Sequence, residues 1–421
     1  MRRPATAGLT NAGDSASLLW ERALAVAGAA DAETTERAQA CTLLGVAEAL
    51  VASRQSSWRQ AALALATEPG PAQVCGCEAQ ASTGGAVAAN SLLMHANLAD
   101  DTYLTAEHPG VQVLPVALAL ADADPTIGGE RWLHAVIAGY EVAGCLAAAT
   151  IPAAPRRGWR VTAAIAPLAA AATATLLLPS PGTTGPQALR LASAFAGGTL
   201  AVFGGGDGWR LQPGAGAVVG LLAARAAGAG LDGDPASLDG EQGLLATMTG
   251  SAAALPVEGG PAILGVTFKR YQVPMYGQAV WAALDGAPLR GALTSMRIRV
   301  PEFATAYAAQ DAGAVTSVQG IALSALAQFV PGARPPAADA IEVIGDNSVG
   351  EHGAVIETID GSGTEHRLDG DGDTSGWGRS DAEAQARQLL GDGAEPLIDA
   401  ARGLVAASSA ASALDLRGER R

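Results

Sequence analysis

Residues 161–178, VTAAIAPLAAAATATLLL, carry no charged side chain over 18 positions. That length only just reaches what a membrane-spanning helix needs. The segment is rich in alanine, contains Pro167, and has no second segment of its kind in the chain. A helix that is apolar on all sides can equally lie at the centre of a large helical domain. We therefore predict a buried core helix here and no membrane partner.

The composition favours closely packed helices in a chain of two domains. At 421 residues a single compact domain would be unusually large. Aromatic residues make up only 4% of the chain, so its core must be built from alanine, leucine and valine. The net charge of −15 argues against nucleic acid or an anionic membrane as a partner, because either needs a basic face.

The pattern of apolar residues changes near residue 266 and again near residue 380. Residues 1–265 read mainly as helices, at 35–52, 115–123, 130–149, 161–178, 187–196 and 214–230. Alternation then predicts strands at 293–300, 340–344, 354–359 and 364–368, with a helix at 315–329 among them. Residues 370–378 read as an acidic, glycine-rich loop, after which Ser380 is expected to cap a further helix. We predict a mainly α fold, with a large helical domain at 1–265 and 380–421 and an inserted α/β lid at 266–379.

Nothing in the sequence predicts a metal or an organic cofactor. The spacing of Cys75 and Cys77 is too tight for the usual zinc or redox pair, and free thiols in a reducing cytoplasm are the better interpretation. The glycine-rich turn at 204–208 lacks the Lys-Ser/Thr of a phosphate-binding loop. Residues 1–19 lack a signal peptide's long apolar core and are expected to be a frayed tail. We expect a cytoplasmic protein with no cofactor.

A short polar loop at residues 88–115 carries most of the candidate chemistry. His95, Asp100, Asp101, Thr102 and His108 gather there between two apolar runs, in a chain with five histidines in all. Catalytic residues are often found on loops that rigid elements hold in place.

These residues resemble the MmgE/PrpD family, which includes 2-methylcitrate dehydratase, cis-aconitate decarboxylase and iminodisuccinate epimerase. The resemblance covers roughly residues 20–400. It rests on Asn90, His95, Asp100, Asp101, Thr102, His108-Pro109 and Val113-Leu114-Pro115, and then on Gly139–Val142, Gly158-Trp159, Asp207-Gly208, Pro213-Gly214 and Phe268–Pro274. It implies a helical domain with an inserted α/β lid, an active site in the cleft between them, a homodimer, and a cofactor-free lyase acting on a small-molecule substrate.

The chain departs from the family at several polar positions. Leu98 stands where the family has a carboxylate, Arg160 where it has a histidine, and Trp209 where it has a lysine. Gln212, Gln272–Pro274 and Gly320 likewise replace polar family groups. Burying an unpaired carboxylate costs several kcal/mol, so a less polar cleft fits a tricarboxylate poorly. The expected substrate is therefore larger and more apolar, with one or two acidic groups at most, and the residues expected to bind it are Leu98, Arg160, Trp209, Arg210, Lys269, Tyr271 and Tyr276.

The resemblance implies that His108 is the general acid or base, oriented by Thr102 and Asp101. The alternative is that His108 only caps a helix or satisfies a buried carbonyl, and His95 reads better as a core histidine. Four functions stay open: a repurposed lyase or isomerase of secondary metabolism, a cyclase that mainly shapes its substrate, an ordinary 2-methylcitrate dehydratase or cis-aconitate decarboxylase, and a non-catalytic binding protein.

Overall fold

The computed structural model describes residues 14–179, 184–204, 206–251, 254–307 and 314–415. The chain divides into two compact units. The first comprises Met1–Leu200, Gly208–Thr267 and Trp377–Arg421, and the second comprises Ala201–Asp207 and Phe268–Gly376.

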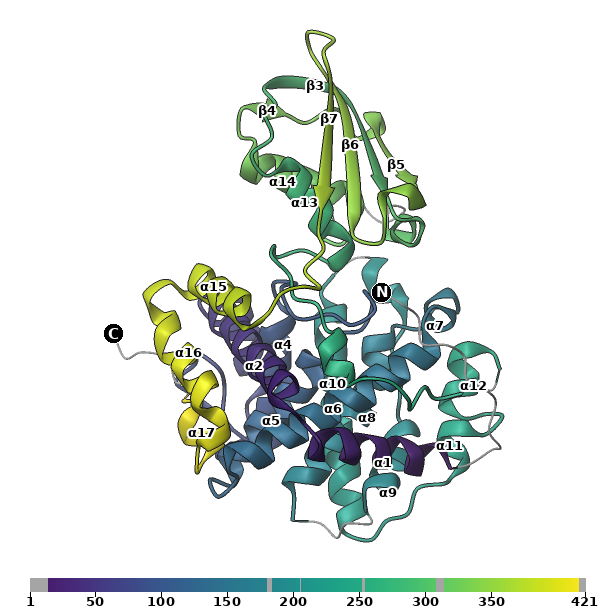
Figure 1. The fold of residues 1–421 in the computed structure, drawn as a ribbon, viewed down its shortest axis with the longest axis vertical. Helices are drawn as coiled ribbons and strands as arrows, with labels where there is room; N and C mark the ends of the chain where they lie inside the picture. Colours follow the sequence, from purple (N-terminus) through teal and green to yellow (C-terminus); the bar gives the residue numbers. More distant parts are fainter. Residues whose placement is uncertain (1–13, 180–183, 205, 252–253, 308–313, 416–421) are drawn as a thin grey trace. The chain divides into compact units, whose positions relative to one another are not determined.

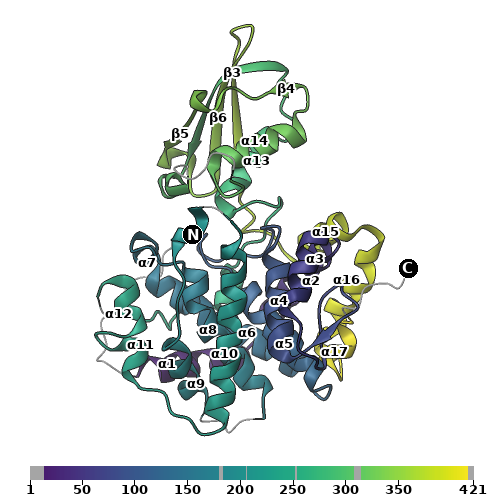
Figure 2. The ribbon, with the colours of Figure 1, turned by 180° about the vertical axis from the view of Figure 1, so that it is seen from behind.

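The first unit consists mainly of helices (Figures 1 and 2). It also contains a two-residue β-ladder between β1 and β2. Its elements are α1 (Ser15–Gly28), α2 (Ala32–Ser53), α3 (Ser56–Leu65), β1 (Ala72–Gln73), β2 (Gln80–Ala81), α4 (Thr83–His95), α5 (Gly110–Ala123), α6 (Gly129–Thr150), α7 (Ala153–Arg156), α8 (Val161–Leu177), α9 (Thr184–Ser193), α10 (Gly208–Gly228), α11 (Ala236–Asp239), α12 (Leu244–Thr249), α15 (Arg379–Leu390), α16 (Ala394–Gly403) and α17 (Ala410–Ala413).

Helix α8 is the centre of this unit, as the uncharged segment predicted. All of its residues except Leu176 are buried, and α5, α6, α9 and α10 pack around it. Small side chains make the close approach possible. A Cβ atom added at Gly220 of α10 would lie 2.6 Å from the Cβ atom of Ala170 on α8, so only glycine fits there. Among the described helices, only α6 is long and apolar enough to cross a membrane, and 83% of its apolar window is buried inside the molecule.

Helix α5 begins earlier than the sequence suggested. Its predicted start was Pro115, but the helix runs from Gly110 and carries Pro115 in its interior. A proline there lacks the N–H that would bond to the carbonyl of Val111. The hydroxyl of Ser91 on α4 donates to that carbonyl at 2.6 Å instead. A partner from a neighbouring helix therefore allows the helix to continue through the proline.

The two ends of the first unit correct further predictions. Residues 14–19, expected to belong to a frayed tail, instead cap and begin helix α1, and residues 1–13 lie outside the described part. Ser380 does not cap α15; the N-cap is Gly378, whose N–H donates to the Asp381 carboxylate at 2.9 Å. Helices α15 and α16, yellow in Figure 1, lie beside the purple α2.

The second unit is a small α/β unit. Its main elements are α13 (Gln278–Leu284), β3 (Gly291–Val300), α14 (Val318–Phe329), β4 (Ala333–Arg334), β5 (Ile341–Gly345), β6 (Gly353–Asp360) and β7 (Glu365–Asp371). Strand β3 pairs with β6 antiparallel and with β4 and β5 in parallel, and β6 pairs with β7. One face of the sheet, including Met296, Ile298 and Ile356, packs against α13 and α14. Strand β7 extends to Asp371, so residues 370 and 371 belong to the sheet and not to the predicted loop.

The fold class is thus mostly helical with a small sheet, as the sequence predicted. The elements that were not predicted are helices α1, α3, α7, α11, α12 and α13 and strands β1, β2 and β4. The glycine-rich turn at 204–208 includes residue 205, outside the described residues, and Gly208 already belongs to α10.

Candidate functional site

The polar loop of the first unit connects the end of α4 at His95 to the start of α5 at Gly110. Thr102 anchors this loop, because its backbone N–H and carbonyl pair with Thr267 at 2.9 and 2.8 Å. Leu98 is buried and adopts a left-handed backbone conformation with φ of 62°. The backbone pairing of Thr102 with Thr267 therefore anchors the loop directly after its two acidic residues.

Asp100 bridges the two histidines of the loop. Its Oδ1 lies 3.1 Å from Nδ1 of His95, and its Oδ2 lies 2.8 Å from Nδ1 of His108. Arg160, just before α8, places its Nη2 2.7 Å from Nε2 of His95. We refer to His95, Asp100, His108 and Arg160 as the polar network. The sequence singled out Asp101 and not Asp100 as the carboxylate that orients His108.

The chemistry of each group fixes the direction of the hydrogen bonds in the polar network. A guanidinium only donates, so Nε2 of His95 accepts from Arg160 and Nδ1 carries the proton toward Asp100. Burial, with smaller contributions from Arg160 and His108, lowers the pKa of His95 to about 3, against the opposing effect of Asp100. His95 is therefore neutral near pH 7.

The same reasoning fixes the tautomer of neutral His108. Its Nδ1 forms a hydrogen bond of 3.1 Å with the backbone carbonyl of Asp101 and lies 2.8 Å from Oδ2 of Asp100 as an ion-pair contact. A carboxylate and a carbonyl both accept, so Nδ1 carries the proton. In the neutral ring the lone pair then lies on Nε2, as a general base requires.

A proline in α10 explains how Arg160 is held. Pro213 lies inside α10 and cannot donate to the carbonyl of Trp209, four residues earlier. Arg160 donates to that carbonyl through Nη1, and also to Oε1 of Gln212 at 3.1 Å. The position where the family has a histidine thus carries a cation whose partners lie inside the protein.

Trp209 and Arg210 extend this buried cluster. The Trp209 ring meets His95 edge-on, with ring centroids 5.0 Å apart. The guanidinium of Arg210 lies 3.8 Å from the Trp209 ring centroid and 4.7 Å from that of Trp58, and its Nε donates to the carbonyl of Ala96 at 2.8 Å. Arg210 is only 8% exposed. Its guanidinium therefore stabilises the protein's own aromatic side chains.

Asp101 points away from the polar network. Its carboxylate accepts from the Gly110 N–H at 2.9 Å and from the Tyr140 hydroxyl at 2.6 Å. A Cβ atom at Gly110 would lie 2.7 Å from Oδ1 of Asp101, so glycine is needed for this contact. Asp101 thus caps the start of α5, and its backbone carbonyl meets Nδ1 of His108 at 3.1 Å.

His108 is the most accessible member of the polar network. Its side chain is 15% exposed, against 0% for His95 and 2% for Asp100. The Thr102 hydroxyl is fully buried and has no hydrogen-bonding partner among the described residues. It makes no bond to His108 that would orient the ring. Among these three side chains, His108 is therefore the one most open to solvent.

The remaining predicted site residues lie in the second unit. Lys269 is buried. The Tyr271 hydroxyl donates to the Asp285 carboxylate at 3.0 Å, and burial raises its pKa. The Tyr276 hydroxyl donates to the carbonyl of Thr316 at 2.6 Å. Both tyrosine hydroxyls therefore bond to the protein within this unit.

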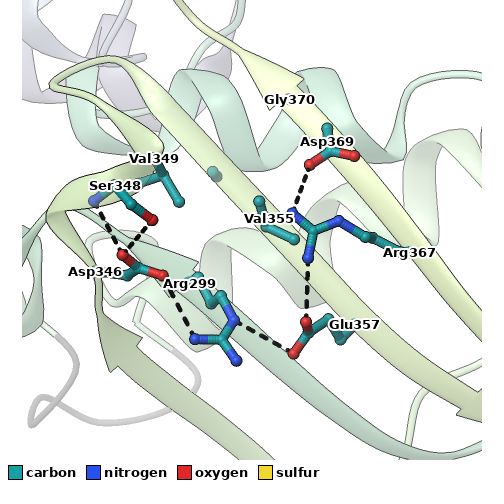
Figure 3. Close-up of a pocket in the computed structure, with 10 residues that line it drawn as sticks. Arg299, Asp346, Ser348, Val349, Val355, Glu357, Arg367, Asp369 and Gly370 are labelled. Carbon is teal, nitrogen blue, oxygen red and sulfur yellow. Dashed lines mark hydrogen bonds and ion pairs between the residues drawn. The ribbon is translucent and has the colours of Figure 1, made fainter.

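A depression of about 440 Å³ lies on the sheet of the second unit (Figure 3). Its charged side chains pair with one another: Arg299 with Asp346 and Glu357, and Arg367 with Glu357 and Asp369. This pairing satisfies the charges locally, so we assign the depression no ligand.

The described residues contain no group of three or more His, Cys, Asp or Glu side chains arranged to hold a metal ion. The four cysteines are buried free thiols. Burial raises the pKa of Cys41, Cys75 and Cys145 above that of an ordinary thiol. These thiols are therefore uncharged at neutral pH.

Comparison with known proteins bears on the first unit. A family model described as the MmgE/PrpD N-terminal domain matches residues 24–255, more than half of the chain. The match includes the whole polar network. No curated protein matches the chain.

Proposed function

This chain belongs to the MmgE/PrpD family, and from that membership we propose that it is a lyase or isomerase in which His108 moves a proton to or from the substrate. The family includes dehydratases and decarboxylases, which supports a lyase-type enzyme in general. The proposal assigns the first chemical step to the most accessible member of the polar network.

The observation that carries the proposal is the 2.8 Å contact between Oδ2 of Asp100 and Nδ1 of His108. A carboxylate at Nδ1 holds the ring in one tautomer and stabilises the imidazolium that forms when Nε2 takes a proton. A positioned acid–base group typically contributes about 10²–10⁴ to the rate. Asp100 is thus the orienting carboxylate, while Asp101 and Thr102 position the loop.

The polar network also supports a substrate with few carboxylates. Arg160 and Arg210 were expected, with Lys269, to be the possible anchors of one carboxylate. Both are buried, and they donate to His95, Trp209, Gln212 and Ala96. Recruiting either cation for a substrate would break contacts inside the protein. We therefore propose that the substrate is relatively apolar and that the protein acts in secondary metabolism.

Proton exchange tests this proposal without a known product. The purified protein is incubated in D₂O with a panel of mono- and dicarboxylic acids and their esters, and loss of C–H signals is followed by NMR. We expect exchange on the compounds of the panel that carry the fewest carboxylates. In His108→Ala the exchange rate should fall by about 10²–10⁴. His134→Ala on α6 is the matched control and should keep the wild-type rate.

Two outcomes contradict the proposal. If exchange persists in His108→Ala, His108 is not the general base. That result favours the alternative function of a cyclase, which acts mainly by shaping its substrate. Turnover of 2-methylcitrate or cis-aconitate at the rate of an ordinary metabolic enzyme contradicts the proposed substrate class.

A further inference from the structure

Glu107 precedes His108 in the chain and is fully buried. Its backbone N–H donates to the carbonyl of Tyr103 at 3.0 Å, and the Tyr103 N–H donates to the carbonyl of Glu107 at 2.7 Å. This small loop fixes where the Glu107 side chain enters the protein. The family resemblance assigned this residue no role.

Gln112 on α5 links Glu107 to His108. Its Nε2 donates to Oε1 of Glu107 and, at 3.1 Å, to the backbone carbonyl of His108. A carbonyl only accepts, so the His108 backbone fixes which end of the amide faces it. Glu107 and the backbone of His108 therefore share one amide group.

The other carboxyl oxygen of Glu107, Oε2, is buried and has no hydrogen-bonding partner among the described residues. An ionised carboxylate in this position would keep one oxygen without a partner, which is costly in a buried site. The charged groups that act on Glu107 are Arg160, which precedes α8, and Asp101 in its own loop, and α5 contributes the uncharged Gln112. Burial raises the pKa of Glu107 to about 8, although Gln112, Arg160 and Thr162 oppose that shift.

We propose that Glu107 is a positioning residue that acts as a neutral carboxylic acid: through Gln112 it fixes the backbone of His108, and its protonation keeps another negative charge away from the Asp100–His108 pair. The proposal rests on the proposed function of His108. It predicts that Glu107 and His108 are coupled, so that ionisation of Glu107 changes the environment of the His108 ring.

Two spectroscopic measurements on the full-length protein test this coupling. Infrared difference spectra between neutral and alkaline pH should show the loss of a protonated carboxyl band in the wild type, and no such band in Glu107→Gln. Nitrogen-15 NMR of the His108 ring should show a step centred near pH 8 in the wild type. That step should vanish in Glu107→Gln, while the ring keeps its Nδ1–H tautomer at neutral pH.

Glu141→Gln is the matched control for the infrared band. Glu141 is also buried on a helix of the first unit, but it pairs with Arg22 at 2.7 Å and accepts from the Ala262 N–H at 2.7 Å. Its replacement should leave the band in place. A band that survives in Glu107→Gln, or a His108 ring without the step in the wild type, overturns the proposal.

Gln112→Leu keeps the test decisive if Glu107→Gln does not fold. This variant should retain the carboxyl band but lose the restraint on His108, seen as broadened ring signals. Unchanged His108 signals in Gln112→Leu overturn the positioning role. Neither spectroscopic measurement uses a substrate. A negative exchange assay would therefore count against His108 as the base, whereas negative spectra would count against Glu107 as the positioning residue.

Discussion

Replacing Arg160 by methionine removes the cation that holds the polar network together. Arg160 is only 4% exposed and donates to Nε2 of His95, Oε1 of Gln212 and the carbonyl of Trp209. Leaving one buried acceptor without a partner costs about 1–3 kcal/mol, and Arg160→Met leaves these acceptors on His95, Gln212 and Trp209 without their donor. We expect Arg160→Met to lower the free energy of unfolding by about 3–5 kcal/mol.

Two assays follow this change. Denaturant unfolding by circular dichroism gives the loss of stability directly, and the same loss should lower the Tm by roughly 3–6 °C in a chain of this length. NMR titration should show the pKa of His95 rising from about 3, because Arg160 is one of the groups that lower it. Burial is the larger cause and remains, so we expect His95 to stay below the pKa of an exposed histidine.

Arg387→Met is the matched control in the same unit. Arg387 pairs with Glu395 at 2.6 Å, but its side chain is 44% exposed, and exposed ion pairs contribute about 0–1 kcal/mol. The reasoning is refuted if Arg160→Met unfolds within about 1 kcal/mol of the wild type, or if the pKa of His95 does not move.

Three further predictions concern packing, pH and the Asp100–His108 pair. Gly220→Ala should lower the free energy of unfolding by about 1–3 kcal/mol, because its Cβ atom would overlap Ala170. Gly84→Ala is the control, since its new Cβ atom meets only Val218 at 3.9 Å. Equal stability of the two variants would contradict the packing argument. Glu107 has a pKa of about 8 in the folded protein against 4.5 for an ordinary glutamate, so folding retains a proton that the unfolded chain releases. Its contribution to stability should therefore fall as pH rises from about 4.5 to about 8, by up to roughly 5 kcal/mol, and urea unfolding across this range should show a flatter profile for Glu107→Gln. Asp100→Asn should lower the C–H exchange rate by about 10²–10⁴, and a wild-type rate would remove Asp100 from the orienting role.

The sequence by itself determined the kinds of elements and most of their places. A run of apolar residues without charge, as in α8, leaves a buried helix as the stable outcome. Alternating residues from 293 to 300 specify a strand with one covered face, which is β3. Element ends were less certain, because they depend on single contacts such as Ser91 with the Val111 carbonyl or Asp381 with the Gly378 N–H.

Only the tertiary structure decided which polar groups meet. Asp100 and Asp101 are neighbours in the chain, yet one carboxylate faces two histidines and the other caps α5. The direction of a loop side chain depends on local backbone angles, which no residue pattern specifies. Arg160 reaches a Trp209 carbonyl that Pro213 leaves without its helical partner, and this pairing exists only because α8 and α10 pack together. The residue types were readable from the sequence, but the distances between them arise from helix packing between segments far apart in the chain.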